Sequence, residues 1–92
     1  NFAGEYIVAT WGCGTSCLMG AVINARTGRI YSLPHTTCCW SVDEDKPIDY
    51  RLNSRLIAFS GMRNESGTDA EGDKHYYEFR NGRFVFIRTV RK

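Results

Sequence analysis

Hydrophobic residues occur along this chain in short runs rich in β-branched and aromatic side chains, separated by Gly, Asn, Ser and Pro. Such runs are typical of strands bounded by turns, and no longer stretch has helical periodicity. The pattern predicts about seven strands, at residues 5–11, 18–24, 29–33, 48–52, 55–60, 74–80 and 83–90. We therefore expect an all-β fold, a small antiparallel meander that forms a barrel or sandwich. Its first three strands would pack against its last four.

The last hairpin is the most strongly predicted element. Asn81-Gly82 is the preferred pair for a two-residue type I′ turn, because both central residues need positive φ. This turn fixes the register, which pairs Arg80 with Arg83, Phe79 with Phe84, Tyr77 with Phe86, and His75 with Arg88. One face then carries four aromatic residues, Tyr77, Phe79, Phe84 and Phe86, and we expect it to lie on the core. The other face carries Tyr76, Glu78, Val85 and Ile87.

The length and charge of the chain limit what it can be. Its 92 residues make one small β domain, residues 1–92, which would bury roughly 60–65% of its unfolded surface. A covalent crosslink would therefore add usefully to its stability. The 12 basic and 10 acidic residues are too balanced for a protein that mainly grips phosphate backbones, so we do not favour a nucleic-acid partner. No apolar run approaches the ~20 residues of a membrane span.

All four cysteines lie in two stretches, Trp11-Gly12-Cys13-Gly14-Thr15-Ser16-Cys17 and His35-Thr36-Thr37-Cys38-Cys39-Trp40. An even number of cysteines in a short chain that begins at Asn1 rather than Met indicates a mature or trimmed form of an exported protein with disulfides. Adjacent cysteines in extended backbone point to opposite sides, so we expect Cys38 and Cys39 each to pair with one of Cys13 and Cys17. A Cys13–Cys17 bridge remains open, because four cysteines allow three connectivities.

Other chemistry at the cysteines is less well supported. A zinc site would have to use the adjacent pair, which is poor chelate geometry, or His35 in place of one cysteine. A metal-binding protein could use the four cysteines together with His35 or a methionine, Met19 or Met62. A redox site would normally show Cys-x-x-Cys at a helix N-terminus, and both features are missing. No G-x-S-x-G elbow is present, so we expect no catalytic residue. His35 follows Pro34 and is expected on a loop surface, whereas His75 is expected to pack within its strand.

Residues 61–73 are polar and glycine-rich, which predicts a flexible loop. Asp69, Glu71 and Asp73 alternate there as carboxylates do in calcium loops. The glycine and the final glutamate of an EF-hand are absent from their positions, so we expect no metal site.

The Trp11–Cys17 stretch and Cys38-Cys39-Trp40 resemble the corresponding stretches in a group of small exported bacterial proteins without an assigned activity. The likeness continues through Ser54-Arg55-Leu56 to the hairpin at Tyr76-Tyr77, and so covers most of the chain. The resemblance implies an extracytoplasmic location and a cysteine-stapled β fold. It implies no catalytic residues.

These observations favour an exported bacterial domain, periplasmic or secreted, that binds another protein without catalysis or a cofactor, as an inhibitor or immunity protein does. A loop anchored by cysteines loses little entropy on binding, and tryptophan is a frequent hot-spot residue. The partner surface is therefore expected on the rim formed by residues 14–16 and 35–45. Its members are Gly14, Thr15, Ser16, His35, Trp40, Asp43, Glu44 and Asp45. The alternatives are a cysteine-based metal-binding protein and a single-stranded nucleic-acid-binding domain, the latter using Arg83, Arg88, Arg91 and Lys92.

Overall fold

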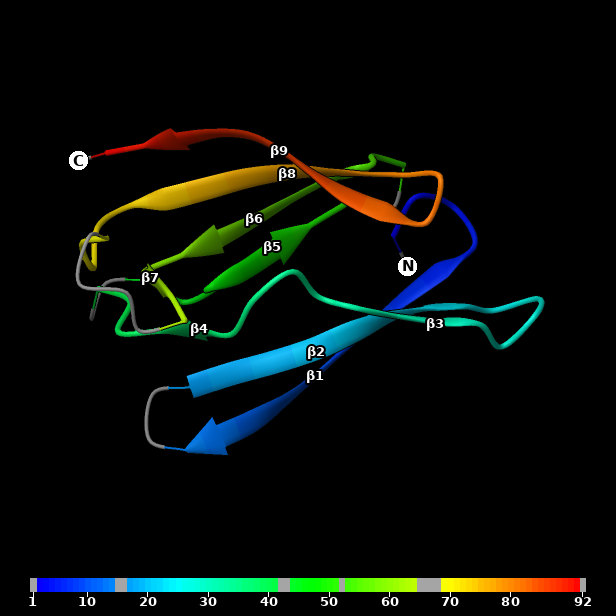
Figure 1. The fold of residues 1–92 in the computed structure, drawn as a ribbon, viewed down its shortest axis with the longest axis horizontal. Coiled ribbons are helices and arrows are strands. Elements are labelled where there is room, and N and C mark those ends of the chain that lie inside the picture. Colours follow the sequence, from blue (N-terminus) through cyan, green and yellow to red (C-terminus); the bar gives the residue numbers. More distant parts are fainter. Residues whose placement is uncertain (1, 15–16, 42–43, 52, 65–68, 92) are drawn as a thin grey trace.

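The fold consists of two antiparallel β-sheets in a computed structural model that describes residues 2–14, 17–41, 44–51, 53–64 and 69–91 (Figure 1). The first sheet contains β1 (Tyr6–Gly14), β2 (Cys17–Asn24), β3 (Ile30–Ser32), β4 (Thr37–Cys38) and β7 (Met62–Arg63). The second sheet contains β5 (Ile48–Tyr50), β6 (Leu56–Ser60), β8 (Lys74–Arg80) and β9 (Arg83–Val90), in that order across the sheet. The described residues form no helix, and therefore none that could cross a membrane.

The predicted all-β class, the antiparallel pairing and the division of the strands are confirmed. The three predicted N-terminal strands are β1, β2 and β3 of the first sheet, and the four later ones make up the second. The sheets share no strand and do not close into a barrel. The short strands β4 and β7 were not predicted, because two residues are too few to show a period. They complete the first sheet, with β4 pairing to β2 on one side and to β7 on the other.

The core lies between the sheets and is largely aromatic. Its buried members come from both sheets, from the N-terminus and from the segment that follows β3: Phe2, Val22, Leu33, Ile57, Phe59, Tyr77 and Phe79. Phe2 is fully buried, and its amide donates a hydrogen bond of 2.7 Å to the carbonyl of Tyr6. The ring of Phe79 lies 5.0 Å from that of Tyr6 and 6.0 Å from that of Phe2. The N-terminal segment is therefore part of the hydrophobic core.

The last hairpin has the predicted turn, and its register holds over the first half of its length. Asn81 and Gly82 have φ of 53° and 73°, as a type I′ turn requires. Tyr77 pairs with Phe86 as expected, but Ile87 is then an extra residue in β9. His75 consequently faces Thr89, so its predicted pairing with Arg88 is wrong. A bulge bends its strand, and Phe86 next to it is 49% exposed, so the prediction that it belongs to the core is also wrong.

Candidate functional site

The two cysteine stretches meet at one end of the first sheet, where Cys17 of β2 is the direct cross-strand partner of Cys38 of β4. Each stretch nevertheless forms its disulfide internally. Cys13 pairs with Cys17 across a Cα–Cα distance of 5.1 Å, and Cys38 pairs with Cys39 across 3.7 Å. The predicted disulfides are therefore present, but the preferred pairing between the stretches is wrong.

Local backbone geometry explains this pairing. Cys13 is the unpaired residue of a bulge between Gly12 and Gly14 at the end of β1, opposite the start of β2. Cys39 has a φ of 60°, so the backbone turns there instead of continuing extended. The premise that adjacent side chains point to opposite sides therefore does not hold at Cys38 and Cys39. All four cysteines are paired, which leaves no thiolate for the metal-binding alternative.

Only part of the predicted partner rim is exposed to solvent. Gly14 and Asp45 are exposed, whereas Trp40 and Glu44 are half-buried. The carboxylate of Glu44 accepts hydrogen bonds from the Lys46 amide at 3.0 Å and the Ser60 hydroxyl at 3.2 Å. Thr15, Ser16 and Asp43 lie outside the described residues. The exposed residues among those that the structure describes in this rim therefore form no continuous apolar centre.

The prediction that His35 lies on a loop surface is wrong, since it is only 9% exposed. Its ring packs on Phe59 at 4.7 Å and on Tyr77 at 5.4 Å, because the segment entering β4 turns this side chain into the core. Nδ1 donates a 2.8 Å hydrogen bond to the carbonyl of Thr36, so Nε2 carries the lone pair. Among the described residues, this buried Nε2 has no hydrogen-bond partner. Burial lowers the pKa of His35 to about 4, so the ring is neutral near pH 7.

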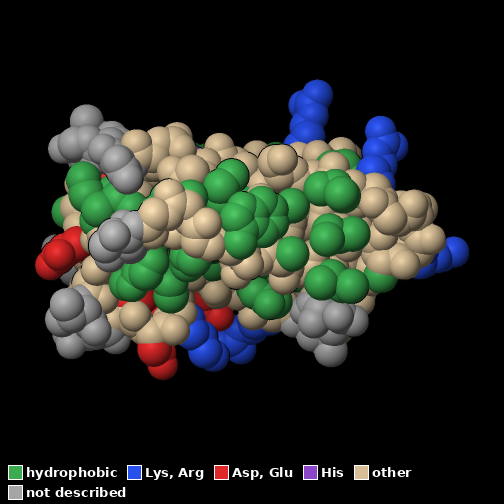
Figure 2. Space-filling view, turned by 90° about the horizontal axis from the view of Figure 1, so that it is seen from below, with side chains coloured by type: hydrophobic (Ala, Val, Ile, Leu, Met, Phe, Trp, Pro, Cys, Tyr) green, Lys and Arg blue, Asp and Glu red, His purple; other side chains and the backbone are tan. Residues whose placement is uncertain are grey.

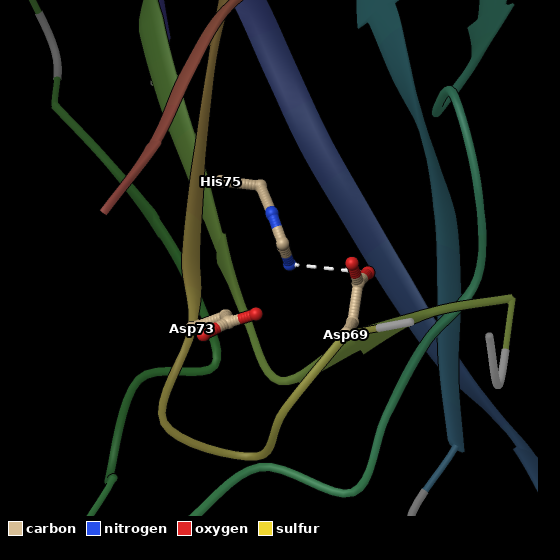
Figure 3. A group of neighbouring side chains, drawn as sticks. All are labelled: Asp69, Asp73 and His75. Atoms are coloured by element: carbon tan, nitrogen blue, oxygen red, sulfur yellow. Dashed lines mark ion pairs between the residues drawn. The ribbon is translucent and has the colours of Figure 1, made fainter. Parts of the chain in front are cut away.

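A second group of buried polar residues consists of Asp69, Asp73 and His75, drawn in Figure 3. The predicted flexible loop is thus wrong for these two aspartates, which are 6% and 2% exposed. One possible ligand atom from each of the three residues lies within 4.8 Å of the others, a spacing that could suit a metal ion. Figure 3 shows the carboxylates and the imidazole directed towards a common centre.

Internal partners already satisfy this group. Arg63 donates to both carboxylate oxygens of Asp69, from Nε at 2.9 Å and Nη2 at 3.1 Å, and Arg91 pairs with Asp73. His75 Nε2 lies 2.8 Å from the carbonyl of Gly61, which can only accept, so Nε2 carries the proton and offers no lone pair to a metal. Hydrogen bonds from Arg63 lower the pKa of Asp69 to about 2. The group is best explained as an ion-pair network that anchors residues 69–75 to β7 and to the end of β9.

The most distinctive surface is the outer face of β1, β2 and β3, which we call the apolar face and define as Ile7, Trp11, Met19, Ile23 and Ile30. Ladder pairing places Ile7 beside Ile23, Trp11 beside Met19, and Ile30 beside Ile23. Trp11 is 48% exposed and Ile30 is 64% exposed. Figure 2 views the molecule from this side and shows hydrophobic side chains spread across its middle. β1 is also an edge strand of its sheet.

Sequence reasoning did not single out the apolar face, although the signal was present in the alternation of Ile7, Ala9 and Trp11 along one strand. An apolar residue at every second position of an edge strand, matched by Met19 and Ile23 on the next strand, indicates a second apolar side on the sheet.

The arginines named for nucleic-acid binding are exposed, but two of the three have intramolecular partners, and Lys92 lies outside the described residues. Arg91 is held by Asp73, and the guanidinium of Arg88 lies over the ring of Tyr76 at 5.8 Å from its centroid. Arg83 is exposed at the hairpin tip. These contacts give little support to the nucleic-acid alternative.

Comparison with protein-family models, with curated proteins and with solved structures found no match to this chain.

Proposed function

We propose that this chain is an exported bacterial domain, periplasmic or secreted, that binds another protein through its apolar face and performs no catalysis. The observation that carries the proposal is the exposure of Trp11, Met19 and Ile30 together on one face of a sheet. Contiguous exposed apolar surface is uncommon on monomeric proteins and marks interaction sites. Export is supported by the two disulfides, which persist in oxidising compartments.

The physical properties of this face suit a protein partner. Tryptophan and methionine are enriched in the centres of protein interfaces, where their large apolar area leaves water. Because the side chains project from paired strands, little backbone entropy is lost on binding. The outer edge of β1 also presents backbone groups to which an extended segment of the partner can add as a further strand.

The rim around residues 14–16 and 35–45 is the competing location for the same function. Gly14, at the end of β1, belongs to the same strand as Trp11. Trp40 is half-buried, which lowers the area it can contribute, whereas Trp11 keeps about half of its surface exposed. The apolar face is therefore preferred as the centre of the interface, with Asp45 at most on its polar margin.

The test begins with capture of a partner from the exported fraction of the source bacterium and its purification, followed by titration calorimetry with matched variants. We expect Trp11→Ala to weaken binding by more than about 2 kcal/mol, roughly thirtyfold, as for a hot-spot tryptophan. Ile87→Ala is the matched control, because Ile87 is similarly exposed at 47% but lies on the second sheet. Unchanged thermal unfolding of both variants would show that the fold is intact.

Two results would contradict the proposal. If Trp40→Ala weakened binding and Trp11→Ala did not, the rim would be the interface and the apolar face would not. If the purified chain instead shifted a short single strand of DNA in a salt-dependent manner, the nucleic-acid alternative would replace protein binding.

A further inference from the structure

We propose that the four cysteines form a thiol–disulfide exchange site that accepts two electrons from a dithiol and then holds them as exposed thiols on Cys13 and Cys39. The exchange creates a new bridge between Cys17 and Cys38. This activity is stoichiometric and goes beyond the proposed binding function, since it uses none of the residues of the apolar face.

The geometry for the new bridge is already present. Cys17 and Cys38 are directly opposite in the antiparallel pairing of β2 with β4. Directly opposite residues have side chains on the same side of the sheet and Cα atoms about 4.5–5.5 Å apart. This separation lies inside the range that a disulfide spans. No movement of the strands is needed to bring these two cysteines into bonding range.

Burial determines which cysteine of each disulfide an external thiolate can attack. Cys17 and Cys38 are 9% and 1% exposed, whereas Cys13 and Cys39 are exposed. An external thiolate can therefore attack the outer cysteine of either disulfide but not the inner one, because exchange depends on access to the sulfur. Attack on Cys39 releases Cys38, whose only cysteine neighbour across the strand pair is Cys17.

The reaction balances in three steps. One thiolate of the dithiol bonds to Cys39 Sγ and breaks the Cys38–Cys39 bond, which leaves Cys38 as a thiolate. The second thiol of the reductant displaces Cys39 and departs as a cyclic disulfide, so two electrons have passed to the protein. The Cys38 thiolate then bonds to Cys17 Sγ and expels the Cys13 thiolate. The two protons lost by the dithiol end on Cys13 and Cys39, and the last step is redox-neutral.

One feature favours the exchanged form over simple reduction of one disulfide, and another favours opening of the Cys38–Cys39 disulfide as the first step. The Cys17–Cys38 bridge closes a much longer loop than either original disulfide, so it restricts the unfolded chain more strongly. Breaking the Cys38–Cys39 bond also frees Cys39 from a positive φ of 60°, a backbone conformation that a residue with a side chain adopts only at a cost.

Trypsin provides a sharp test, because the chain has no lysine or arginine before Arg26 and is cut again after Arg29. Cys13 and Cys17 therefore lie on one peptide, and Cys38 and Cys39 on another. The protein is treated with one equivalent of dithiothreitol, blocked with N-ethylmaleimide and digested without further reduction. We expect the two peptides to be joined, with maleimide on Cys13 and Cys39. In the untreated protein they should be separate.

Two outcomes would overturn the proposal in the wild-type protein itself. Separate peptides with both maleimides on Cys38 and Cys39 would show reduction without exchange. A mixture of unreacted protein and protein with maleimide on all four cysteines would show that no exchanged form accumulates. As a second measurement, a C13S/C39S variant should form the Cys17–Cys38 bridge in air; a folded variant that keeps two free thiols would contradict the cross-strand geometry.

Discussion

His35 should make this domain less stable as the pH falls from about 6.5 to about 4. The ring is buried against Phe59 and Tyr77, and desolvation is the largest cause that lowers its pKa from the ordinary value of 6.5 to about 4. The positive charges of Arg63 and of His75, when protonated, act in the same direction. The hydrogen bond to the Thr36 carbonyl and the charge of Asp69 oppose the shift but do not cancel it.

The sign follows from proton binding in the two states. Between about pH 6.5 and pH 4 the unfolded chain binds a proton at His35 and the folded chain does not, so lowering the pH favours unfolding. The full stabilisation is present above the unfolded pKa. The two pKa values give a loss of about 1.4 kcal/mol at pH 5.5 and about 2.6 kcal/mol at pH 4.5. For a domain of ordinary stability, this is a large fraction of the total.

The assay is urea unfolding followed by tryptophan fluorescence at several pH values between 8 and 4, with wild type and His35→Phe compared. Phenylalanine retains an aromatic ring against Phe59 but cannot take up a proton. The quantity to compare is the fall in the free energy of unfolding between pH 8 and pH 4.5. In the wild type His35 contributes about 2.6 kcal/mol to this fall, and we expect the variant to lack that contribution, whatever its stability at pH 8. If the two curves fell in parallel between pH 6.5 and 4, another group would carry the pH dependence and the reasoning about His35 would be refuted.

Three further outcomes follow from the structure. Phe79→Ala should lower the free energy of unfolding in urea by about 3–5 kcal/mol, because Phe79 is 1% exposed. Val85→Ala, on the half-buried outer side of the same hairpin, should lower it clearly less, and equal losses would contradict the assigned core face. Asp69→Asn should cost about 1.5–3 kcal/mol and remove the contribution of Asp69 to the loss of stability between about pH 3.8 and 2, since the carboxylate with its lowered pKa is gone. An acid limb as steep as that of the wild type would contradict this. Gly61→Ala should lower the melting temperature in thermal unfolding. Gly61 has a φ of 103°, and a Cβ there would collide with the Cys38 carbonyl oxygen. An unaltered melting temperature would refute that contact.

The strands and the last turn could be predicted because they depend on neighbours in the sequence. Asn81-Gly82 sets its own turn through the φ values that these two residues adopt readily, and the two-residue loop then fixes Phe79 opposite Phe84. Runs of β-branched and aromatic residues defined where seven of the nine described strands lie. The even number of cysteines likewise indicated two disulfides without indicating their pairing.

The candidate sites depended on contacts between distant segments. His35 looks like a loop residue in the sequence, yet the pairing of β4 with β2 and β7 draws its ring into the core. Asp69 belongs to a polar stretch, but Arg63 supplies the hydrogen bonds that let its carboxylate be buried. The disulfide pairing followed from the left-handed turn at Cys39. Local sequence thus determined which segments extend and where they turn, whereas burial and pairing were decided by how the two sheets pack, because a side chain's neighbours across a sheet are remote in the chain.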